Sequence, residues 1–168
     1  LFTLFGMLPF YFSGGIPSVT DAFFETMSGF TTTGATILDD IESLSHGLLF
    51  WRSLTQWIGG LGIVFFTIAV LPIFGGGTIQ LFSAEAIGVT HDKTHPRIDV
   101  MAKWLWMIYA ILTVVETMLL MIGGMSFFDA VCHSFSTTAT GGYSTKQASV
   151  AYWNSPFIEY VIAIFMIL

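Results

Sequence analysis

Thr31-Thr32-Thr33-Gly34-Ala35-Thr36-Ile37 is the stretch of sequence that decides the fold. Three consecutive β-branched threonines followed by a glycine disfavour a continuing helix and favour extended or irregular backbone. The segments on either side are hydrophobic enough to lie in a bilayer, where irregular backbone is tolerated only if protein buries it or if it lines a water-filled cavity. The stretch therefore predicts a loop that is enclosed by helices or that lines a pore.

The composition is that of a membrane protein. Of the 168 residues, 54% are hydrophobic and 10% are charged, whereas a soluble domain carries roughly 25% charged residues. The net charge of −6 and the absence of a basic cluster in the sequence give no indication of a nucleic-acid partner. Cys132 is the one cysteine and has no internal disulfide partner. Leu1 and Leu168 both lie within apolar runs, so we expect an internal piece of a longer polytopic protein.

The segments before this stretch are too short to cross a membrane. Residues 1–12 are apolar but interrupted by Pro9, and a crossing needs about 20 residues, so we expect part of a truncated spanning helix. Ser18 and Asp21 fit a capping box with Asp in the place of Glu, which predicts a short helix over about residues 20–30.

The segment after the stretch is long enough to cross. Residues 47–72 are apolar, and Pro72 with the triple glycine that follows is expected to end the helix, so the first unit covers residues 1–77. Residues 78–100 are then expected to form a linker that starts with a short interfacial helix. Three small residues in the middle of the span permit close helix–helix approach: Gly59, Gly60 and Gly62.

The same order of segments recurs in the second unit, residues 101–168. A span over about 102–125 precedes a capped short helix over 128–138, a second threonine and glycine loop over 139–144, and a further span from about residue 156 that is cut short. Asp21 and Asp129 are 108 positions apart (129 − 21), and at this offset several other residues agree: Ser18 with Ser126, Ala22 with Ala130, Ser28 with Ser136, Thr32 with Thr140, and Gly34 with Gly142. The chain is therefore predicted to hold two copies of a helix–pore-loop–helix unit.

The two loops have the composition of a cation filter. A dehydrated cation needs oxygen dipoles in place of its hydration shell, and potassium filters provide them with backbone carbonyls. Glycine lets the backbone adopt angles that a side chain penalises, and the negative C-terminal ends of the short helices favour a cation. The residues predicted to bind the ion are Thr32, Thr33, Gly34, Ala35, Thr140, Gly141, Gly142 and Tyr143. The alternative is that each loop is an ordinary re-entrant turn or a helix-packing site.

Several motifs resemble those of the TrkH/KtrB potassium-uptake family within the Trk/Ktr/HKT superfamily, and the resemblance is closer to TrkH than to the plant transporters. They are Asp21-Ala22-Phe23-Phe24-Glu25, Ser28 to Thr36, Gln56-Trp57-Ile58-Gly59-Gly60-Leu61-Gly62-Ile63, Ile68-Ala69-Val70-Leu71-Pro72, His133-Ser134-Phe135-Ser136 and Gly141-Gly142-Tyr143-Ser144-Thr145.

The resemblance implies an all-α membrane protein with four non-identical repeats around one pore, of which two are present here. It further implies a homodimer in the bacterial inner membrane, gated by a cytosolic TrkA-like nucleotide-binding subunit, with potassium as the transported substrate and no cofactor. The gate would lie in the third repeat. A central glycine, as at Gly34 and Gly142, goes with potassium in this superfamily, whereas serine in the first loop goes with sodium.

Charge predicts the orientation. Lys93, Arg97 and Lys103 cluster between the two units, so the positive-inside rule places the linker in the cytoplasm. The loops, with the acidic residues Asp39, Asp40 and Glu42, then face outside, where they raise the local cation concentration.

Other polar residues have open alternatives. Glu116, in the middle of a span, is either an ion-coupling group or a hydrogen-bonded or interface-facing carboxylate. Arg52 either tethers a loop or extends to the membrane interface, and His133 either packs or gates. The pair His91 and His95, on a polar loop, is a weak metal site without further ligands.

Two other classes of function compete with cation uptake by a transporter that is not an enzyme. An intramembrane enzyme or haem carrier needs a nucleophile with its base or two facing histidines on spans, and no predicted full span contains a histidine. A structural segment would use the loops for packing only. A sodium-coupled or sodium-permeable transporter of the same superfamily is the further alternative.

Overall fold

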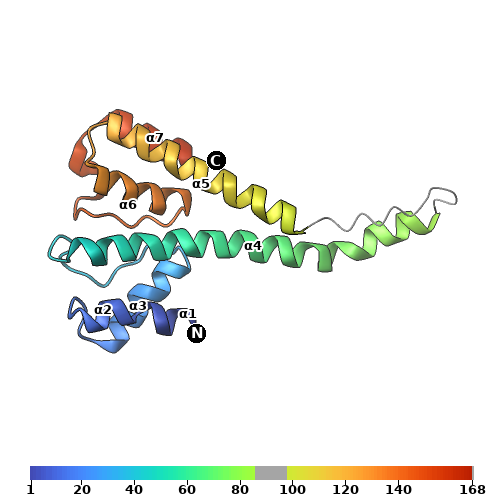
Figure 1. Cartoon of the computed structure of the whole chain (residues 1–168), viewed down its shortest axis with the longest axis horizontal. Coiled ribbons are helices and arrows are strands. Elements are labelled where there is room, and N and C mark those ends of the chain that lie inside the picture. The colour runs from blue at the N-terminus through green and yellow to red at the C-terminus, as the bar shows by residue number, and fades with distance from the viewer. Residues whose placement is uncertain (86–97, 168) are drawn as a thin grey trace.

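The computed structural model describes residues 1–85 and 98–167, and over these residues it contains helices and no strands. The elements are α1 (Phe2–Gly6), α2 (Leu8–Phe12), α3 (Val19–Phe30), α4 (His46–Glu85), α5 (Ile98–Ile122), α6 (Phe127–Thr138), a 3-10 helix η1 (Ser149–Trp153) and α7 (Pro156–Phe165). Helix α4 runs through the middle, with α1, α2 and α3 on one side and α5, α6 and α7 on the other (Figure 1).

The two short helices α3 and α6 are copies of one another. Both have 12 residues, and the bounds of α3 shifted by 108 positions (19 + 108 = 127, 30 + 108 = 138) are those of α6. Each begins after a serine whose hydroxyl accepts a hydrogen bond from the backbone N–H three residues later, at 3.4 Å for Ser18 and 3.1 Å for Ser126. A serine in this place satisfies one of the N–H groups that a helix leaves unpaired at its start.

One helix among the described residues is long and apolar enough to cross a bilayer, and it is α5 over Ala102–Ile122. Much of its apolar surface is exposed, including Trp104, Ile111, Val114 and Met118. Exposed apolar surface on this scale marks contact with lipid or with further protein rather than with water. The exposed face of α5 is therefore consistent with the predicted membrane environment.

Helix α4 does not end where the sequence predicts. It continues as one helix of 40 residues to Glu85, so the predicted end at residue 72 and the separate interfacial helix after it are wrong. A proline costs about 3 kcal/mol and a glycine about 1 kcal/mol in a helix interior, and such local preferences are weak against the rest of a long helix. The linker predicted over 78–100 starts inside α4, and the stretch 86–97, with His91, Lys93, His95 and Arg97, lies outside the described residues.

Two glycines of α4 let both short helices approach it closely. A Cβ atom on Gly59 would overlap the carbonyl oxygen of Phe30, the last residue of α3. A Cβ atom on Gly60 would come within 3.1 Å of the Cβ of Ala139, which directly follows α6. Because these glycines are adjacent, α3 and α6 end at the same level of α4, and the loops that follow them start side by side.

Candidate ion-binding loops

The chain leaves α3 and α6 through the same unusual backbone conformation. Thr32 and Thr140 have φ angles of 53° and 52°, and Gly34 and Gly142 have φ angles of 75° and 86°. Left-handed backbone is common for glycine but uncommon for a β-branched residue. A threonine held there costs on the order of 1–3 kcal/mol and persists only where the surrounding structure fixes it, which is typical of functional sites.

The same pair of backbone hydrogen bonds closes both helix ends. Thr33 N–H donates to the Ser28 carbonyl at 3.0 Å, and Gly141 N–H donates to the Ser136 carbonyl at 2.8 Å. Thr32 and Thr140 each donate to the carbonyl three residues earlier, at 2.9 and 2.8 Å. These are the bonds of a Schellman motif, which ends a helix by satisfying its last carbonyls. The two loops therefore begin with the same geometry.

The loops meet at their glycines. A Cβ atom on Gly34 would overlap the Gly141 carbonyl oxygen and would lie 3.7 Å from the Gly142 Cα. Two stretches that lie 108 positions apart in the sequence are thus in contact where each predicted ion-binding segment has its central glycine.

Most carbonyl oxygens of the two segments have no donor within the described part of the chain. The carbonyls of Thr32–Gly34 and Thr140–Tyr143 accept no hydrogen bond from a described residue. The Ala35 carbonyl differs, because it accepts from the Ser28 hydroxyl at 2.6 Å and from the Tyr143 hydroxyl at 3.3 Å. The backbone oxygens of residues 32–34 are therefore without a donor among the described residues, whereas the carbonyl of Ala35, a predicted ion ligand, is engaged by protein.

A buried ion pair lies behind the loops. Arg52 Nε donates to the Glu25 carboxylate at 2.6 Å, and the two side chains are 2% and 0% exposed. Glu25 also accepts from the Thr36 hydroxyl at 3.0 Å and from the Ile37 N–H at 3.0 Å. Removing one partner of a buried pair costs about 3–5 kcal/mol because the other charge is left uncompensated. Arg52 therefore tethers the loops and does not extend to the membrane interface.

Gln56, one helical turn after Arg52, holds the second loop. Its side-chain oxygen accepts from the Ser136 hydroxyl at 2.7 Å and from the Tyr143 N–H at 3.2 Å. Gly141 packs directly on this amide, which leaves no room for a Cβ atom. The second loop is consequently more buried than the first, since Gly141, Tyr143, Ser144 and Thr145 are buried whereas Thr33, Ala35 and Thr36 are exposed.

His133 takes the place in α6 that Glu25 has in α3 (25 + 108 = 133). Its Nδ1 contacts the Asp129 carbonyl at 2.8 Å and its Nε2 contacts the Ser144 hydroxyl at 3.0 Å. A carbonyl only accepts, so Nδ1 donates, and Nε2 of the neutral ring accepts from Ser144. Burial lowers the pKa of the His133 imidazole, while the carbonyl and the charge of Asp129 act in the opposite direction. The contacts assign His133 to packing behind the second loop.

The capping residues have further partners in the second unit. Asp129 accepts from the Ser126 hydroxyl at 2.7 Å and from the Thr145 hydroxyl at 2.6 Å, so it joins the start of α6 to the end of the second loop. Asp21 lies in the first turn of α3, where Ser18 accepts from its N–H. An acidic residue in the first turn of a helix is stabilised by the helix dipole.

Glu116 is buried in α5, away from both loops in sequence, and neither of its carboxylate oxygens has a hydrogen-bond partner among the described residues. Cys132 is a buried free thiol. Among the described residues no cluster of His, Cys, Asp or Glu could hold a metal ion.

Sequence reasoning assigned no role to Glu25 or Gln56, and it predicted Tyr143 as an ion ligand without its contact to the first unit. A signal for the ion pair was present, because Glu25 and Arg52 carry opposite charges in the short helix before the first loop and the span after it. A charge at membrane depth needs a partner. No comparable signal marks Gln56 or the tyrosine hydroxyl.

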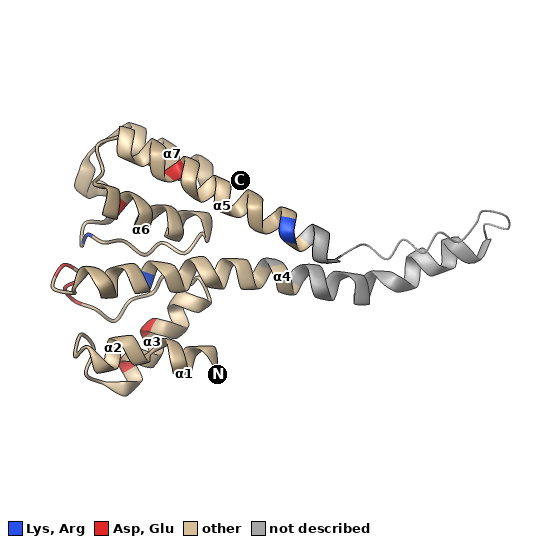
Figure 2. Ribbon diagram, in the orientation of Figure 1, with Lys and Arg blue, Asp and Glu red and all other residues tan. Residues whose placement is uncertain are grey.

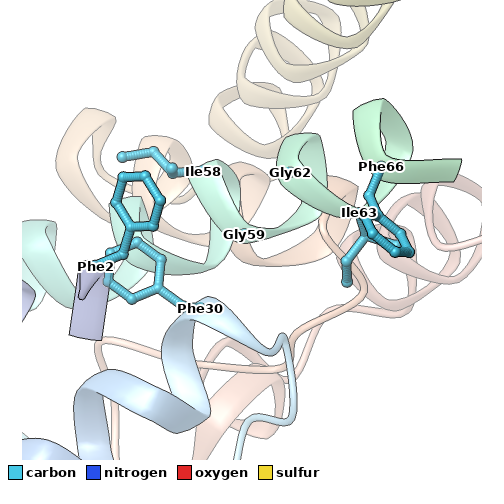
Figure 3. A pocket seen from close by; sticks show the side chains of 7 residues that line it. All are labelled: Phe2, Phe30, Ile58, Gly59, Gly62, Ile63 and Phe66. Atoms are coloured by element: carbon cyan, nitrogen blue, oxygen red, sulfur yellow. The ribbon is translucent and has the colours of Figure 1, made fainter. Parts of the chain in front are cut away.

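An apolar pocket of about 350 Å³ lies apart from the polar loop contacts. Figure 3 shows that aromatic and aliphatic side chains and two glycines line it: Phe2, Phe30, Ile58, Gly59, Gly62, Ile63 and Phe66. Apolar walls provide no oxygen ligands for a cation, so this pocket is not the ion site.

Comparisons with known proteins agree with this arrangement. A family model described as "TrkH: Cation transport protein" matches residues 2–168. The Trk system potassium uptake protein TrkH of Salmonella typhimurium is 52% identical over 165 residues, which are 97% of this chain and 34% of that protein. The Trk system potassium uptake protein TrkG of Escherichia coli K12 is 38% identical over 170 residues, which are 100% of this chain and 35% of that protein.

The crystal structure of the potassium transporter TrkH from Vibrio parahaemolyticus matches with a TM-score of 0.81 at 41% sequence identity, over 98% of this chain and 32% of that one. The chain thus spans about a third of the length of these relatives. The all-helical membrane fold and the family resemblance predicted from the sequence are confirmed.

Proposed function

Because the chain belongs to the TrkH family of cation transport proteins, we propose that it forms part of a pore for potassium uptake across a membrane. The observation that carries the proposal is the contact of Gly34 with Gly141. It brings together two loops of the same entry geometry, whose backbone oxygens at residues 32–34 and 140–143 accept no hydrogen bond from a described residue. Similar proteins are named potassium uptake proteins, which supports potassium as the cation that the loops would take.

The loops supply the chemistry that a potassium ion needs. Backbone carbonyls from residues 32–34 and 140–143 would replace water around the ion, with Gly34 and Gly142 at the centre of each segment. The buried carboxylate behind the first loop, that of Glu25, is engaged by Arg52, Thr36 and Ile37. The ion would therefore meet neutral dipoles instead of a fixed counter-charge that could trap it.

The remaining ligands would come from the rest of the protein. The exposed side of the first loop fits a pore whose other walls are two further repeats, since the chain spans about a third of its relatives' length. We expect the complete protein to be a homodimer in the bacterial inner membrane, associated with a cytosolic TrkA-like nucleotide-binding subunit. No part of this role needs an enzymatic activity, a cofactor or a nucleic acid.

The distribution of charge supports an outward orientation of the loops. Figure 2 shows acidic residues at the end of the molecule where α4 begins, with basic residues also on that side, and a further basic residue near the beginning of α5, toward the opposite end. By the positive-inside rule the end with Lys103 would face the cytoplasm. Asp39, Asp40 and Glu42 would then lie at the outer mouth and attract cations, an effect that salt weakens.

The proposal is tested by potassium uptake of the full-length protein in potassium-starved cells. We expect growth and uptake to depend on it, and Gly34→Ser or Gly142→Ser to erode discrimination against sodium. Ser155→Ala, a substitution at an N-cap whose side chain makes no capping bond, is the matched control and should leave uptake unchanged. Unchanged discrimination in both glycine variants would refute the assignment of the loops, and uptake of sodium in preference to potassium would refute the choice of ion.

A further inference from the structure

Arg52 belongs to the first unit, yet its side chain binds both units. Its Nε donates to Glu25 in α3 at 2.6 Å, and its Nη1 donates to the Ser144 carbonyl in the second loop at 3.0 Å. The side chain is 2% exposed. A guanidinium is suited to this position because its planar group presents several donors in fixed directions, which an ammonium does not.

Tyr143 makes the reciprocal connection from the second unit to the first. Its ring lies 3.7 Å from the Arg52 guanidinium carbon, a cation–π contact. Its hydroxyl donates to the Glu25 carbonyl at 2.8 Å and to the Ala35 carbonyl at 3.3 Å. Tyr143 therefore passes behind the first loop and holds it from a position one residue after Gly142.

These contacts form a closed set at the level of the two glycines. Ala35 follows Gly34 directly and Tyr143 follows Gly142 directly. The bonds to the Ala35 and Ser144 carbonyls therefore restrain the backbone of both loops close to their glycines, and the bonds to Glu25 fix the same side chains to α3. The spacing between the two loops thus depends on the side chains behind them as well as on the glycines in contact.

On this geometry we propose that Arg52, Glu25 and Tyr143 form a brace between the two units that sets the distance between their loops and, through it, the preference for potassium over sodium. The three are positioning residues in this scheme, and the inference rests on the proposed function. Discrimination between two ions of the same charge requires a cage of defined size or stiffness, and the brace supplies that stiffness across the boundary between the units.

The brace is specific to this boundary within the described part of the chain. The position equivalent to Glu25 in the second unit holds His133 (25 + 108 = 133), which bonds only residues of its own unit. Helix α7, which follows the second loop as α4 follows the first, contains no arginine or lysine over Pro156–Phe165. The second unit therefore has no copy of the buried charge pair.

The test uses the full-length protein reconstituted in lipid vesicles, with rubidium uptake as the probe and increasing sodium as the competitor. The double variant E25Q/R52Q removes the pair without leaving a lone buried charge, and Y143F removes only the hydroxyl that reaches Glu25 and Ala35. R52K keeps the charge but not the planar group. The matched control is K146Q, which removes a positive charge from a partly exposed pair with Glu42 at 3.6 Å.

We expect the preference for rubidium over sodium to fall by roughly tenfold in E25Q/R52Q, the size of effect that loss of hydrogen bonds to a charged group gives. The preference of Y143F and R52K for rubidium over sodium should lie between that of E25Q/R52Q and that of the wild type. The preference of K146Q should equal that of the wild type. Assembled E25Q/R52Q with wild-type preference would overturn the brace. Loss of assembly in E25Q/R52Q, Y143F and R52K alike would also overturn it, because the residues would then serve folding and not positioning.

The proposed function fails by a different result. If the wild-type protein takes up no rubidium, or shows no preference for rubidium over sodium, both the proposed function and the brace are refuted. If the wild type and the brace variants all keep the preference for rubidium over sodium, the brace proposal is refuted and the proposed function stands.

Discussion

Glu25 and His133 occupy equivalent places in α3 and α6, and each bonds the equivalent residue near the end of its loop. Glu25 accepts from the Thr36 hydroxyl at 3.0 Å, and His133 Nε2 contacts the Ser144 hydroxyl at 3.0 Å. The pairs differ by the same 108 positions (133 − 25 and 144 − 36). The repeat has therefore kept the attachment of loop to helix while changing its chemistry from a charged carboxylate to a neutral imidazole.

This difference predicts that the stability of the folded protein depends on pH through His133 in the second unit. The folded protein lowers the pKa of His133 below its ordinary value of 6.5, so the unfolded chain binds more protons on acidification. The stability that comes from the neutral ring is present above about pH 6.5 and is lost as the pH falls below it. His133→Gln can still bond Ser144 but does not titrate.

The measurement is the thermal unfolding midpoint of the full-length protein in detergent across that pH range. We expect the wild type to lose stability more steeply than His133→Gln as the pH falls. Parallel curves would show that the imidazole is not the titrating group.

Two glycines of α4 that lie three positions apart, Gly59 and Gly62, predict opposite effects of substitution by alanine on stability. Gly59→Ala places a methyl group on the Phe30 carbonyl and should destabilise by about 1–3 kcal/mol, as overpacking does. Gly62→Ala has no heavy atom within 4 Å of the new Cβ and should be neutral or stabilising by up to about 1 kcal/mol, because alanine favours helix. Thermal unfolding of both variants checks this, and equal destabilisation would contradict the close approach of α3 to α4.

The serine caps of α3 and α6 predict losses of stability of different size when each serine is replaced by alanine. Ser126→Ala should cost about 1 kcal/mol, since the serine both accepts from the Asp129 N–H and donates to its carboxylate. Ser18→Ala should cost less, because its one capping bond is 3.4 Å long. Ser155→Ala should cost nothing measurable, because the hydroxyl makes no capping bond. Denaturation of the three variants gives the order, and a Ser155 effect as large as that of Ser126 would contradict it.

The two central glycines should not respond equally to alanine. At Gly34 a methyl group meets both a φ of 75° and the Gly141 carbonyl, whereas at Gly142 it meets a φ of 86° and open space. Left-handed backbone costs alanine about 1–2 kcal/mol, and the overlap adds about 1–3 kcal/mol at Gly34 alone. Potassium uptake by the full-length variants should therefore be lower for Gly34→Ala. A more severe effect of Gly142→Ala would show that the loops do not meet as described.

Local sequence features predicted a large part of this architecture. Serine and aspartate three positions apart identify the starts of α3 and α6, and a threonine run with glycine identifies where each helix gives way to a loop, because these effects act within a few residues. The internal offset of 108 was visible in the sequence and recurs in helix bounds, φ angles and hydrogen bonds.

The contacts that join the units could not be predicted in this way. Tyr143 and Glu25 lie 118 positions apart, and their bond depends on how closely α4 packs against α3 and α6. The end of α4 was predicted wrongly: Pro72 and the glycines after it suggested that the helix stops there, but it continues to Glu85. Both cases show local preference overridden by the arrangement of the whole chain.

The most direct measurement of the central claim is anomalous diffraction from crystals of the full-length protein grown with rubidium in place of potassium. Backbone oxygens at Gly34 and Gly142 that replace the hydration shell of one ion should produce a rubidium peak between the two loops, within ligand distance of carbonyls from both. A peak bound by only one loop, or rubidium located elsewhere while the space between the glycines stays without density, would contradict the account.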